Sequence, residues 1–318
     1  MTAAKRLAVI CLYGPTASGK TEFALQCADA FGCELVSVDS ALVYRGLDIG
    51  TAKPDAVTQA QYPHKLVDVV DPWEHYSAAD FCRDAAQAIR DAHAAGRVPL
   101  LVGGTMLYFR ALLEGLNTLP ASDPVVRSAL QRALAEEGLA PLRAELARVD
   151  PALHARLSDN DTQRTLRGLE VWRMTGRPLS VWHAEPRVLP LPLEALELAL
   201  WPEPRASLHH HIEVRFDAML ELGFLDEVDR LRSDPRMHAD LPSMRSVGYR
   251  QAWQFRDGAC DFDRFRARAI AATRQLAKRQ FTWLRSLPTV PRHNPYHAVD
   301  GYHPFLQRIT TWLEAVSD

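Results

Sequence analysis

Short continuous apolar runs alternate with helix-length segments through the first third of the chain. The runs at 7–13, 33–40 and 98–105 have the length and composition of buried strands. The segments at 19–31 and 78–95 carry apolar residues at helical spacing. Buried strands that are each followed by a helix are typical of a parallel sheet with helices on both faces.

The pattern changes after residue 118. From 119 to 193 the apolar positions follow helical spacing, and no strand signal is present. One more apolar strand, at 195–201, could rejoin the sheet. We therefore expect three parts: the first part of the sheet core at 1–118, a helical insertion at 119–193, and the core completion with basic C-terminal helices at 194–318.

The first predicted strand runs directly into the stretch GPTASGKT, residues 14–21. Gly14 and Gly19 allow a tight turn in which successive backbone N–H groups point inward, and the following helix adds its positive N-terminal end. Lys20 supplies a full positive charge, and the hydroxyl of Thr21 is placed to bind Mg²⁺. The stretch matches the phosphate-binding loop (P-loop) pattern completely. The sequence thus predicts an α/β fold: a P-loop parallel sheet flanked by helices, with an inserted all-helical domain.

Two further polar residues end strands of the predicted sheet. Asp39 lies at the end of the second strand, and Thr105 lies at the end of the third. Ligands of open parallel sheets bind at the carboxyl ends of the strands. We therefore expect the P-loop, Asp39 and Thr105 to meet in one crevice.

Composition limits where the protein works and what it binds. The formal net charge of −2 gives no general attraction to nucleic acid, so any basic surface must be local. The five cysteines are scattered without a Cys-x-x-Cys pair, as expected for free thiols in a reducing compartment. No stretch approaches the roughly 20 apolar residues of a membrane span, and the short apolar N-terminal run leads straight into the P-loop. We expect a cytoplasmic protein that does not bind membranes.

The segment 264–285 contains no acidic residue. On a helix six of its basic residues fall within one arc and five of its apolar residues on the opposite side. The basic set is Arg264, Arg268, Arg274, Lys278, Arg279 and Arg285, and the apolar set is Ile270, Leu276, Phe281, Trp283 and Leu284. Two interpretations stay open: a solvated helix face, and a polyanion-binding groove, which the lack of an acidic partner favours. A second basic set, diluted by acidic residues, lies in the insertion: Arg156, Arg164, Arg167, Arg173 and Arg177.

Two other features invite a functional interpretation. The three histidines at 209–211 resemble a metal cluster, but neighbours on a helix point in different directions and no carboxylate or cysteine lies at ligand spacing. The seven tryptophans could be platforms for nucleic-acid bases, although core packing is their commoner use. We expect neither a metal at the histidines nor a set of stacking tryptophans.

Several segments together resemble one family, the tRNA dimethylallyltransferases, also called isopentenyl-diphosphate:tRNA transferases. Besides GPTASGKT, the segments are VDSALVYRGLDIGTAKP (38–54), PLLVGGTMLYFRALLEGL (99–116), QRTLRGLEVWRMTGRPLS (163–180), SMRSVGYRQAW (243–253) and TRQLAKRQFTWLR (273–285). The P-loop alone is common to many families. The motifs DIGTAKP, VGGT, VGYRQ and TRQLAKRQ in this order are specific, and the resemblance covers nearly the whole chain.

The resemblance implies transfer of the dimethylallyl group from dimethylallyl diphosphate to an adenosine of tRNA. The acceptor is the exocyclic amine of the adenosine on the 3′ side of the anticodon, in tRNAs that read codons beginning with U. The P-loop would then hold the diphosphate of the isoprenoid, with Mg²⁺ as the cofactor. The partner is the tRNA anticodon stem-loop, whose target base must be extruded into the crevice. We expect the enzyme to act as a monomer.

The resemblance also assigns roles to individual residues. Asp39 matches the general base and Thr105 the residue that positions the target nucleotide, while Lys20 would neutralise the leaving diphosphate. Thr21 is the expected Mg²⁺ ligand. The expected diphosphate-binding residues are Gly14, Pro15, Thr16, Ala17, Ser18, Gly19, Lys20, Thr21 and Arg215. The expected tRNA-binding residues are Asp39, Ser40, Ala41, Leu42, Thr105, Arg127, Gln163, Arg164, Thr165, Leu166, Arg167, Arg245, Ser246, Val247, Gly248, Tyr249, Arg250, Arg274, Lys278, Arg279 and Arg285.

The sequence departs from the family at two positions, and two other functions stay in view. Leu42 stands where many members have glutamine, and His211 stands where members have an arginine. A P-loop nucleotide-dependent small-molecule kinase is the first alternative, but the third strand ends in Gly-Gly-Thr rather than in an aspartate that would organise Mg²⁺ around ATP. A non-catalytic tRNA-binding module is the second, and it leaves Lys20, Thr21 and Asp39 unexplained.

Overall fold

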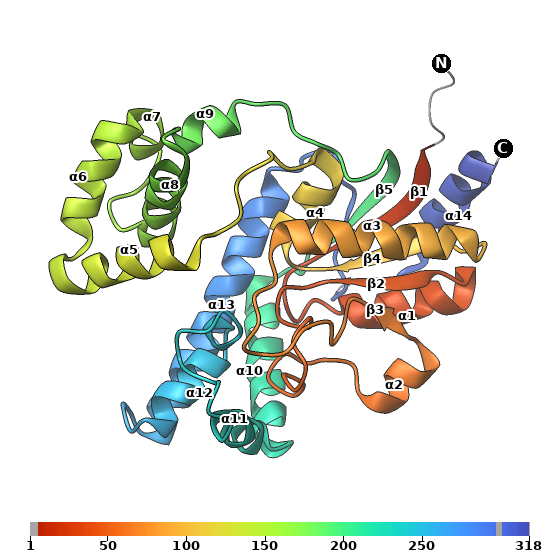
Figure 1. The fold of residues 1–318 in the computed structure, drawn as a ribbon. Coiled ribbons are helices and arrows are strands. Elements are labelled where there is room, and N and C mark those ends of the chain that lie inside the picture. The colour runs from red at the N-terminus through yellow and green to blue at the C-terminus, as the bar shows by residue number, and fades with distance from the viewer. Residues whose placement is uncertain (1–5, 297–300, 318) are drawn as a thin grey trace. The chain divides into compact units, whose positions relative to one another are not determined.

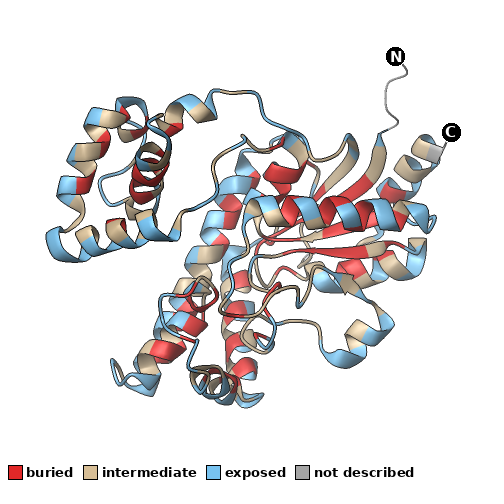
Figure 2. Cartoon of the chain, in the orientation of Figure 1, coloured by how far each residue is buried: buried red, intermediate tan, exposed pale blue. Residues whose placement is uncertain are grey.

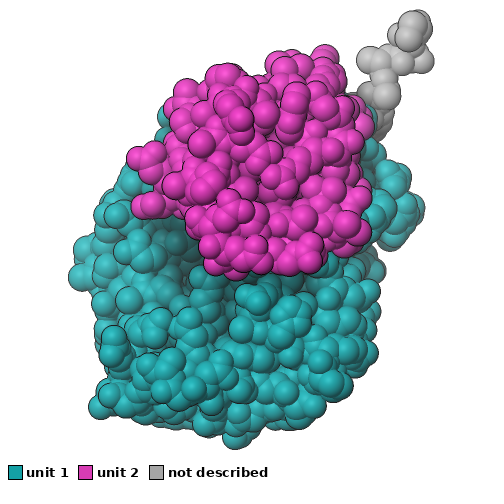
Figure 3. Space-filling model, turned by 60° about the vertical axis from the view of Figure 1, so that its left-hand side comes forward, with its two compact units in different colours: residues 1–113, 190–318 teal, residues 114–189 magenta. Residues whose placement is uncertain are grey.

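The computed structural model describes residues 6–296 and 301–317, and it divides into two compact units. Unit 1 comprises the described parts of 1–113 and 190–318, and unit 2 comprises 114–189 (Figure 3). Unit 2 thus begins and ends earlier than the insertion expected at 119–193. The later boundary differs because Leu193 already starts a strand of unit 1.

Unit 1 is built on a six-stranded sheet in which all neighbouring strands are parallel, in the order β3-β2-β4-β1-β5-β6. The strands are β1 (Leu7–Tyr13), β2 (Glu34–Val38), β3 (His64–Lys65), β4 (Pro99–Gly103), β5 (Leu193–Leu200) and β6 (Arg292–His293). The four strands predicted from apolar runs are present as β1, β2, β4 and β5, and the parallel sheet is confirmed. The edge strands β3 and β6 are too short to show any periodicity.

The helices that begin in unit 1 lie on both faces of this sheet and beyond its edge (Figure 1). They are α1 (Lys20–Phe31), α2 (Ala56–Gln61), α3 (Ala78–Ala94), α4 (Met106–Glu114), α10 (Arg205–Glu221), α11 (Phe224–Arg232), the 3-10 helix η1 (Ser243–Arg245), α12 (Tyr249–Arg256), α13 (Phe262–Arg285) and α14 (His303–Ser317). No helix among the described residues is long and apolar enough to span a membrane.

Alternation along β1 explains how the sheet is covered. Ile10 and Leu12 point to one face, where they pack with α14 and with Phe23 of α1. Tyr13 points to the other face, where its ring lies 4.4 Å from that of Phe109 in α4. Buried residues are accordingly concentrated on the central strands (Figure 2). This two-sided burial fixes the strands whose carboxyl ends form the site.

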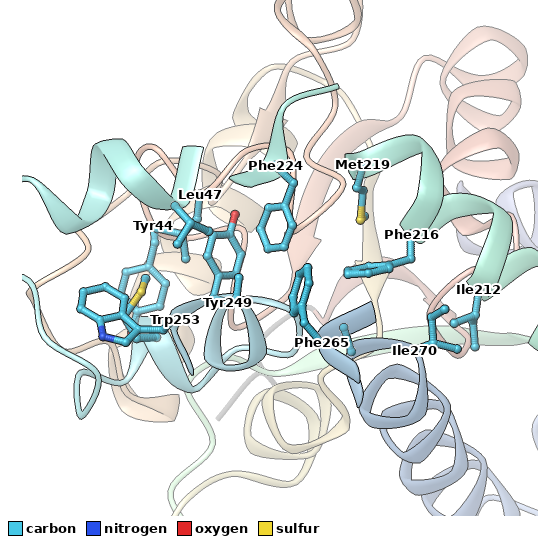
Figure 4. Packing of buried hydrophobic residues seen from close by; sticks show 14 of the residues in the cluster. Tyr44, Leu47, Ile212, Phe216, Met219, Phe224, Tyr249, Trp253, Phe265 and Ile270 are labelled. Atoms are coloured by element: carbon cyan, nitrogen blue, oxygen red, sulfur yellow. The ribbon is translucent and has the colours of Figure 1, made fainter. Parts of the chain in front are cut away.

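A second core of unit 1 lies among α10, α11, α12 and α13 (Figure 4). Its aromatic rings meet edge to face, with Phe224 5.1 Å from Tyr249 and Phe216 5.8 Å from Phe265. Leu47, from the loop after β2, is buried in the same cluster. This core therefore anchors both the C-terminal helices and the loop that follows Asp39.

Unit 2 is helical, as expected of the insertion. Its helices are α5 (Pro124–Glu137), α6 (Leu139–Val149), α7 (Pro151–His154), α8 (Thr162–Thr175) and α9 (Leu179–His183). They enclose a core of their own that includes Leu130, Leu146 and Leu169. A backbone bridge between Leu116 and Val188 joins the two ends of the unit.

Candidate functional site

A pocket of about 1290 Å³ opens in unit 1 at the carboxyl ends of the central strands. It is lined by residues 16–21 of the P-loop, by Asp39 after β2 and by Thr105 after β4. The predicted meeting of these three segments in one crevice is confirmed. Side chains of α10 and α13 and the segment 242–248 complete the lining.

The P-loop is held in place by residues from distant parts of the chain. Arg215 of α10 donates a hydrogen bond to the hydroxyl of Thr16. The hydroxyl of Tyr296 donates a hydrogen bond to the carbonyl of Ala17 across 2.9 Å. Ala17 itself has a φ of 62°, in the left-handed region that residues other than glycine rarely adopt. The loop is therefore already shaped as an anion-binding turn.

Two cations, Lys20 and Arg215, lie partly buried beside this loop. Burial lowers the pKa of Lys20 to about 7, and the Asp39 carboxylate opposes this shift while Arg215 adds to it. The ammonium of Lys20 donates a hydrogen bond to the carbonyl of Pro15 at 2.6 Å. Burial likewise lowers the pKa of the Arg215 guanidinium. An anion bound between the two would favour their charged forms, so the site is electrostatically suited to a polyanion such as a diphosphate.

Asp39 and Thr105 form one hydrogen-bonded turn at the edge of the pocket. One carboxylate oxygen of Asp39 accepts from the backbone N–H of Ala41 at 2.8 Å and of Leu42 at 3.4 Å. The other oxygen accepts no hydrogen bond from the residues that the structure describes. The hydroxyl of Thr105 accepts from the backbone N–H of Ser40 at 3.0 Å. Asp39 thus combines a role in the turn with an oxygen that is available to a ligand.

Gln280 of α13 connects the P-loop to the segment after β4. Its side-chain oxygen accepts from the backbone N–H of Thr16 at 2.8 Å, and its side-chain nitrogen donates to the carbonyl of Gly104 at 3.0 Å. Gln280 was not expected at the site from the sequence. A signal was available, since Gln280 falls at helical spacing with the buried Ala277 and Leu284. A polar residue on that face needs partners inside the protein.

Glu227 of α11 was also not identified from the sequence. It holds the backbone at the start of the DIGTAKP segment. Its buried carboxylate accepts hydrogen bonds from three consecutive backbone N–H groups, those of Asp48, Ile49 and Gly50. It also accepts from the hydroxyl of Tyr249 at 2.5 Å. The expected contact between the Tyr249 side chain and tRNA is therefore wrong, because this side chain is fully buried and holds Glu227.

The other tRNA-binding residues expected in unit 1, apart from Arg274, fall into two groups. Eight line the pocket beside the catalytic candidates: Ser40, Ala41, Leu42, Arg245, Ser246, Val247, Gly248 and Arg279. Three more are exposed but lie outside the pocket lining: Arg250, Lys278 and Arg285. Two sequence segments thus contribute an exposed basic residue to the pocket itself, Arg245 and Arg279.

The expected charge pattern of α13 needs two corrections. Arg274 was taken to lack an acidic partner, but it forms an ion pair with Glu213 of α10 and is only partly exposed. Residues 264–285 of α13 include no Asp or Glu, so the acidic partner of Arg274 comes from another helix. Trp283 was assigned to the buried side, but its side chain is exposed and lines the pocket, as does Leu276.

In unit 2 most of the expected tRNA-binding residues are either paired with an acidic side chain or buried. Arg127 and Arg167 both pair with Glu170, which is buried. The side chains of Thr165 and Leu166 are buried in the core of the unit, so the expected tRNA contacts of these two side chains are wrong. Helical spacing places both on the inner face of α8. The exposed members of the segment are Gln163 and Arg164, and Arg164 pairs with Asp161.

The histidine run at 209–211 lies in α10. Within the described residues, no group of three or more His, Cys, Asp or Glu side chains could hold a metal ion. His211 instead lies exposed at the pocket, with its ring 4.6 Å from that of Tyr296. Of the tryptophans, Trp253 is a core residue as expected.

Oxygen donors near the P-loop suit Mg²⁺. Thr21 lies at the start of α1 and lines the pocket. In the part of the chain that the structure describes, the hydroxyls of Ser18 and Ser37 are buried without a hydrogen-bond partner, and both residues line the same pocket. Mg²⁺ prefers oxygen ligands, keeps several waters and is commonly bound through substrate phosphates. The donor set therefore fits this ion.

Comparisons with known proteins agree on one family. Residues 42–287 match the family model described as IPP transferase. The chain is 57% identical over 302 residues to the tRNA dimethylallyltransferase of Stenotrophomonas maltophilia, covering 93% of this chain and 95% of the relative. It is 55% identical over 314 residues to the tRNA dimethylallyltransferase of Xanthomonas oryzae pv. oryzae, covering 95% and 96%.

Solved structures give the same result for the fold. The full-length tRNA isopentenylpyrophosphate transferase from Bacillus halodurans is 30% identical and superposes with a TM-score of 0.68, covering 98% of this chain and 97% of that one. A eukaryotic dimethylallyltransferase acting on tRNA is 27% identical with a TM-score of 0.70, covering 88% of this chain and 70% of that one. The likeness thus extends over both units.

Proposed function

The chain belongs to the tRNA dimethylallyltransferase family, and from this premise we propose the reaction that its pocket performs. The dimethylallyl group of dimethylallyl diphosphate moves to the exocyclic amine of the adenosine on the 3′ side of the anticodon, in tRNAs that read codons beginning with U. The observation that carries the proposal is the placement of an anion-binding loop, two partly buried cations and a strand-end carboxylate around one pocket.

The P-loop side of the pocket serves the leaving group. Cleavage of the carbon–oxygen bond leaves its electron pair on the diphosphate, so negative charge grows on the phosphate oxygens. Lys20 and Arg215 are placed beside the loop to neutralise this charge, and their burial strengthens the interaction. Thr21, with Ser18 and Ser37 nearby, would hold Mg²⁺, which supplies further positive charge to the diphosphate when bound.

The strand ends that carry Asp39 and Thr105 serve the acceptor. The adenosine amine loses a proton as it forms the new carbon–nitrogen bond, and the available oxygen of Asp39 is the proposed acceptor of that proton. Thr105 holds the adjoining turn through Ser40 and lines the same part of the pocket. In the transfer a carbon–nitrogen bond forms to adenosine, the carbon–oxygen bond to diphosphate breaks, and the proton of the amine goes to Asp39.

The tRNA is proposed to bind through exposed residues of both units. Arg245 and Arg279 line the pocket and remain exposed, and Lys278 and Arg285 extend the basic surface along α13. Gln163 and Arg164 are the proposed contacts from unit 2. Because the target base lies in a structured loop, it must leave the loop to reach the pocket. We further propose that the enzyme works as a monomer in the cytoplasm, where its tRNA substrates occur.

The proposed function has a direct test. The protein is incubated with dimethylallyl diphosphate, Mg²⁺ and unmodified tRNA, and the tRNA is then digested to nucleosides for mass spectrometry. The expected product is an adenosine heavier by one isoprene unit, found only when all three components are present. Unmodified adenosine in every tRNA would refute the proposal, and phosphate release from ATP in parallel samples would favour the kinase alternative.

A further inference from the structure

We propose that Gln280 is a positioning residue that aligns the diphosphate loop with the acceptor side of the pocket. The inference rests on the proposed function, because alignment matters only if a group passes between the two sides. Gln280 is 7% exposed, and it lies on a different face of α13 from the basic residues that are proposed to bind tRNA. Its role is therefore different from theirs.

The first argument is the pair of hydrogen bonds that one side chain makes. The amide oxygen of Gln280 accepts from the backbone N–H of Thr16 at 2.8 Å, and the amide nitrogen donates to the carbonyl of Gly104 at 3.0 Å. Thr16 lies in the P-loop, and Gly104 immediately precedes Thr105. One side chain thus joins the loop proposed to hold the leaving group to the segment proposed to hold the acceptor.

The absence of a side chain at Gly104 leaves space for the side chain of Gln280. A Cβ atom at Gly104 would lie 2.2 Å from the side-chain nitrogen of Gln280 and 3.2 Å from the carbonyl oxygen of Gly14. Glycine at this position thus leaves the space in which the end of the Gln280 side chain lies, and a Cβ there would displace it. Gly104, the second glycine of VGGT, and Gln280, the last residue of TRQLAKRQ, are therefore in direct contact.

The chemistry explains what this contact would contribute. The amine nitrogen must approach the dimethylallyl carbon while the bond to the diphosphate oxygen breaks, so the donor and acceptor must be held at a fixed separation. A displacement of about 1 Å in such a site can lower the rate about 10²-fold. Gln280 lines the pocket, but both polar atoms of its side chain are bonded to backbone groups, so it is assigned to positioning and not to substrate contact. Its loss should lower turnover more than the binding of either substrate.

The test compares two Gln280 variants with a matched control. Gln280→Met keeps the length and bulk of the side chain but removes both hydrogen bonds. Gln280→Glu keeps an acceptor for Thr16 and places a carboxylate against the carbonyl of Gly104. Gln275→Met makes the same chemical change at an exposed position of the same helix. Each protein is assayed for kcat with tRNA and dimethylallyl diphosphate, for Kd with tRNA and with inorganic diphosphate, and for its melting temperature.

We expect kcat to fall by about 10²-fold in Gln280→Met and in Gln280→Glu, with both Kd values within about threefold of wild type. The control should match wild type throughout. Three results would overturn the inference: an unchanged kcat, a loss of affinity as large as the loss of kcat, or failure of both variants to fold. If wild type and the control form no prenylated adenosine, the proposed function fails and the inference fails with it. If they form it and Gln280→Met is equally fast, only the inference fails.

Discussion

The backbone N–H of Ser40 donates a hydrogen bond to the hydroxyl of Thr105 across 3.0 Å, and this bond joins the ends of β2 and β4. The backbone N–H of Thr105 in turn donates to the carbonyl of Val38 at 3.2 Å. Asp39 lies between Val38 and Ser40, so both of its neighbours are fixed by the same threonine. The orientation of the proposed base is therefore set by the residue proposed to position the nucleotide.

Replacing Thr105 tests this relationship. Thr105→Val keeps the shape of the side chain but removes the acceptor of the Ser40 N–H, and the loss of this one hydrogen bond should cost the turn about 0.5–1.5 kcal/mol. We expect a kcat reduced about tenfold or more, as measured by single-turnover prenylation. Thr105→Ser retains the hydroxyl and should stay close to wild type. A valine variant as fast as the serine variant would remove Thr105 from the mechanism.

The carboxylate of Asp39 should matter for catalysis rather than for the turn. Asp39→Asn keeps an oxygen that accepts from the N–H of Ala41, so the turn should persist, but it removes the proposed base. We expect turnover to fall by about 10²- to 10⁴-fold, the usual contribution of a general base. Affinity for tRNA, measured by filter binding, should change little. A loss of affinity as large as the loss of turnover would assign Asp39 to binding instead.

The pKa of Lys20 predicts how diphosphate binding depends on pH. With a pKa of about 7 in the free protein, Lys20 loses its charge as the pH rises above neutrality. A bound anion favours the charged form, so binding above pH 7 should be accompanied by proton uptake. Calorimetric titration of inorganic diphosphate in buffers of different ionisation enthalpy measures this directly. Lys20→Met should abolish the proton uptake, and uptake that persists in this variant would mean that another group is responsible.

The same pKa has a consequence for stability. The pKa of Lys20 is lower in the folded protein than its ordinary value of 10.5, so between about pH 7 and 10.5 the unfolded chain binds the extra proton. The contribution of this group therefore raises the free energy of unfolding, and so stabilises the folded protein, as the pH rises through this window. Below pH 7 its burial as a cation destabilises the ligand-free protein.

Lys278 and Arg274 should differ in their contribution to tRNA binding. Lys278 is exposed on α13, whereas Arg274 is paired with Glu213. If Lys278 contacts one phosphate, Lys278→Ala should reduce the slope of log affinity against log salt by about 0.7–0.9. Arg274→Ala should leave the slope unchanged and lower the melting temperature instead. Equal slopes for wild type and Lys278→Ala would place that lysine outside the tRNA interface.

Local sequence signals were sufficient for the parts of the fold that depend on neighbouring residues. The apolar runs predicted β1, β2, β4 and β5, and the P-loop spacing predicted the turn that leads into α1. Asp39 and Thr105 could be placed at the pocket because parallel strands bring their carboxyl ends to one edge. These inferences need only periodicity and topology.

The contacts that the sequence did not reveal join residues that are far apart along the chain. Glu227 binds backbone N–H groups of residues 48–50, and no pattern within either segment predicts the pairing. Arg274 was taken as a free cation because its partner, Glu213, lies on another helix. Tyr249 belongs to a family motif, but its ring lies in the core among α10–α13 (Figure 4). A motif residue can thus be specific to a family while its role is to hold the fold.

The central claim is that the P-loop holds an isoprenoid diphosphate and does not hydrolyse ATP. The most direct measurement follows diphosphate, phosphate and prenylated adenosine together in reactions that contain tRNA with dimethylallyl diphosphate or with ATP. We expect equal amounts of diphosphate and prenylated adenosine from the isoprenoid, no phosphate from ATP, and no product from Lys20→Ala, which lacks the ammonium beside the P-loop. Steady tRNA-stimulated release of phosphate from ATP without any prenylated adenosine would contradict it.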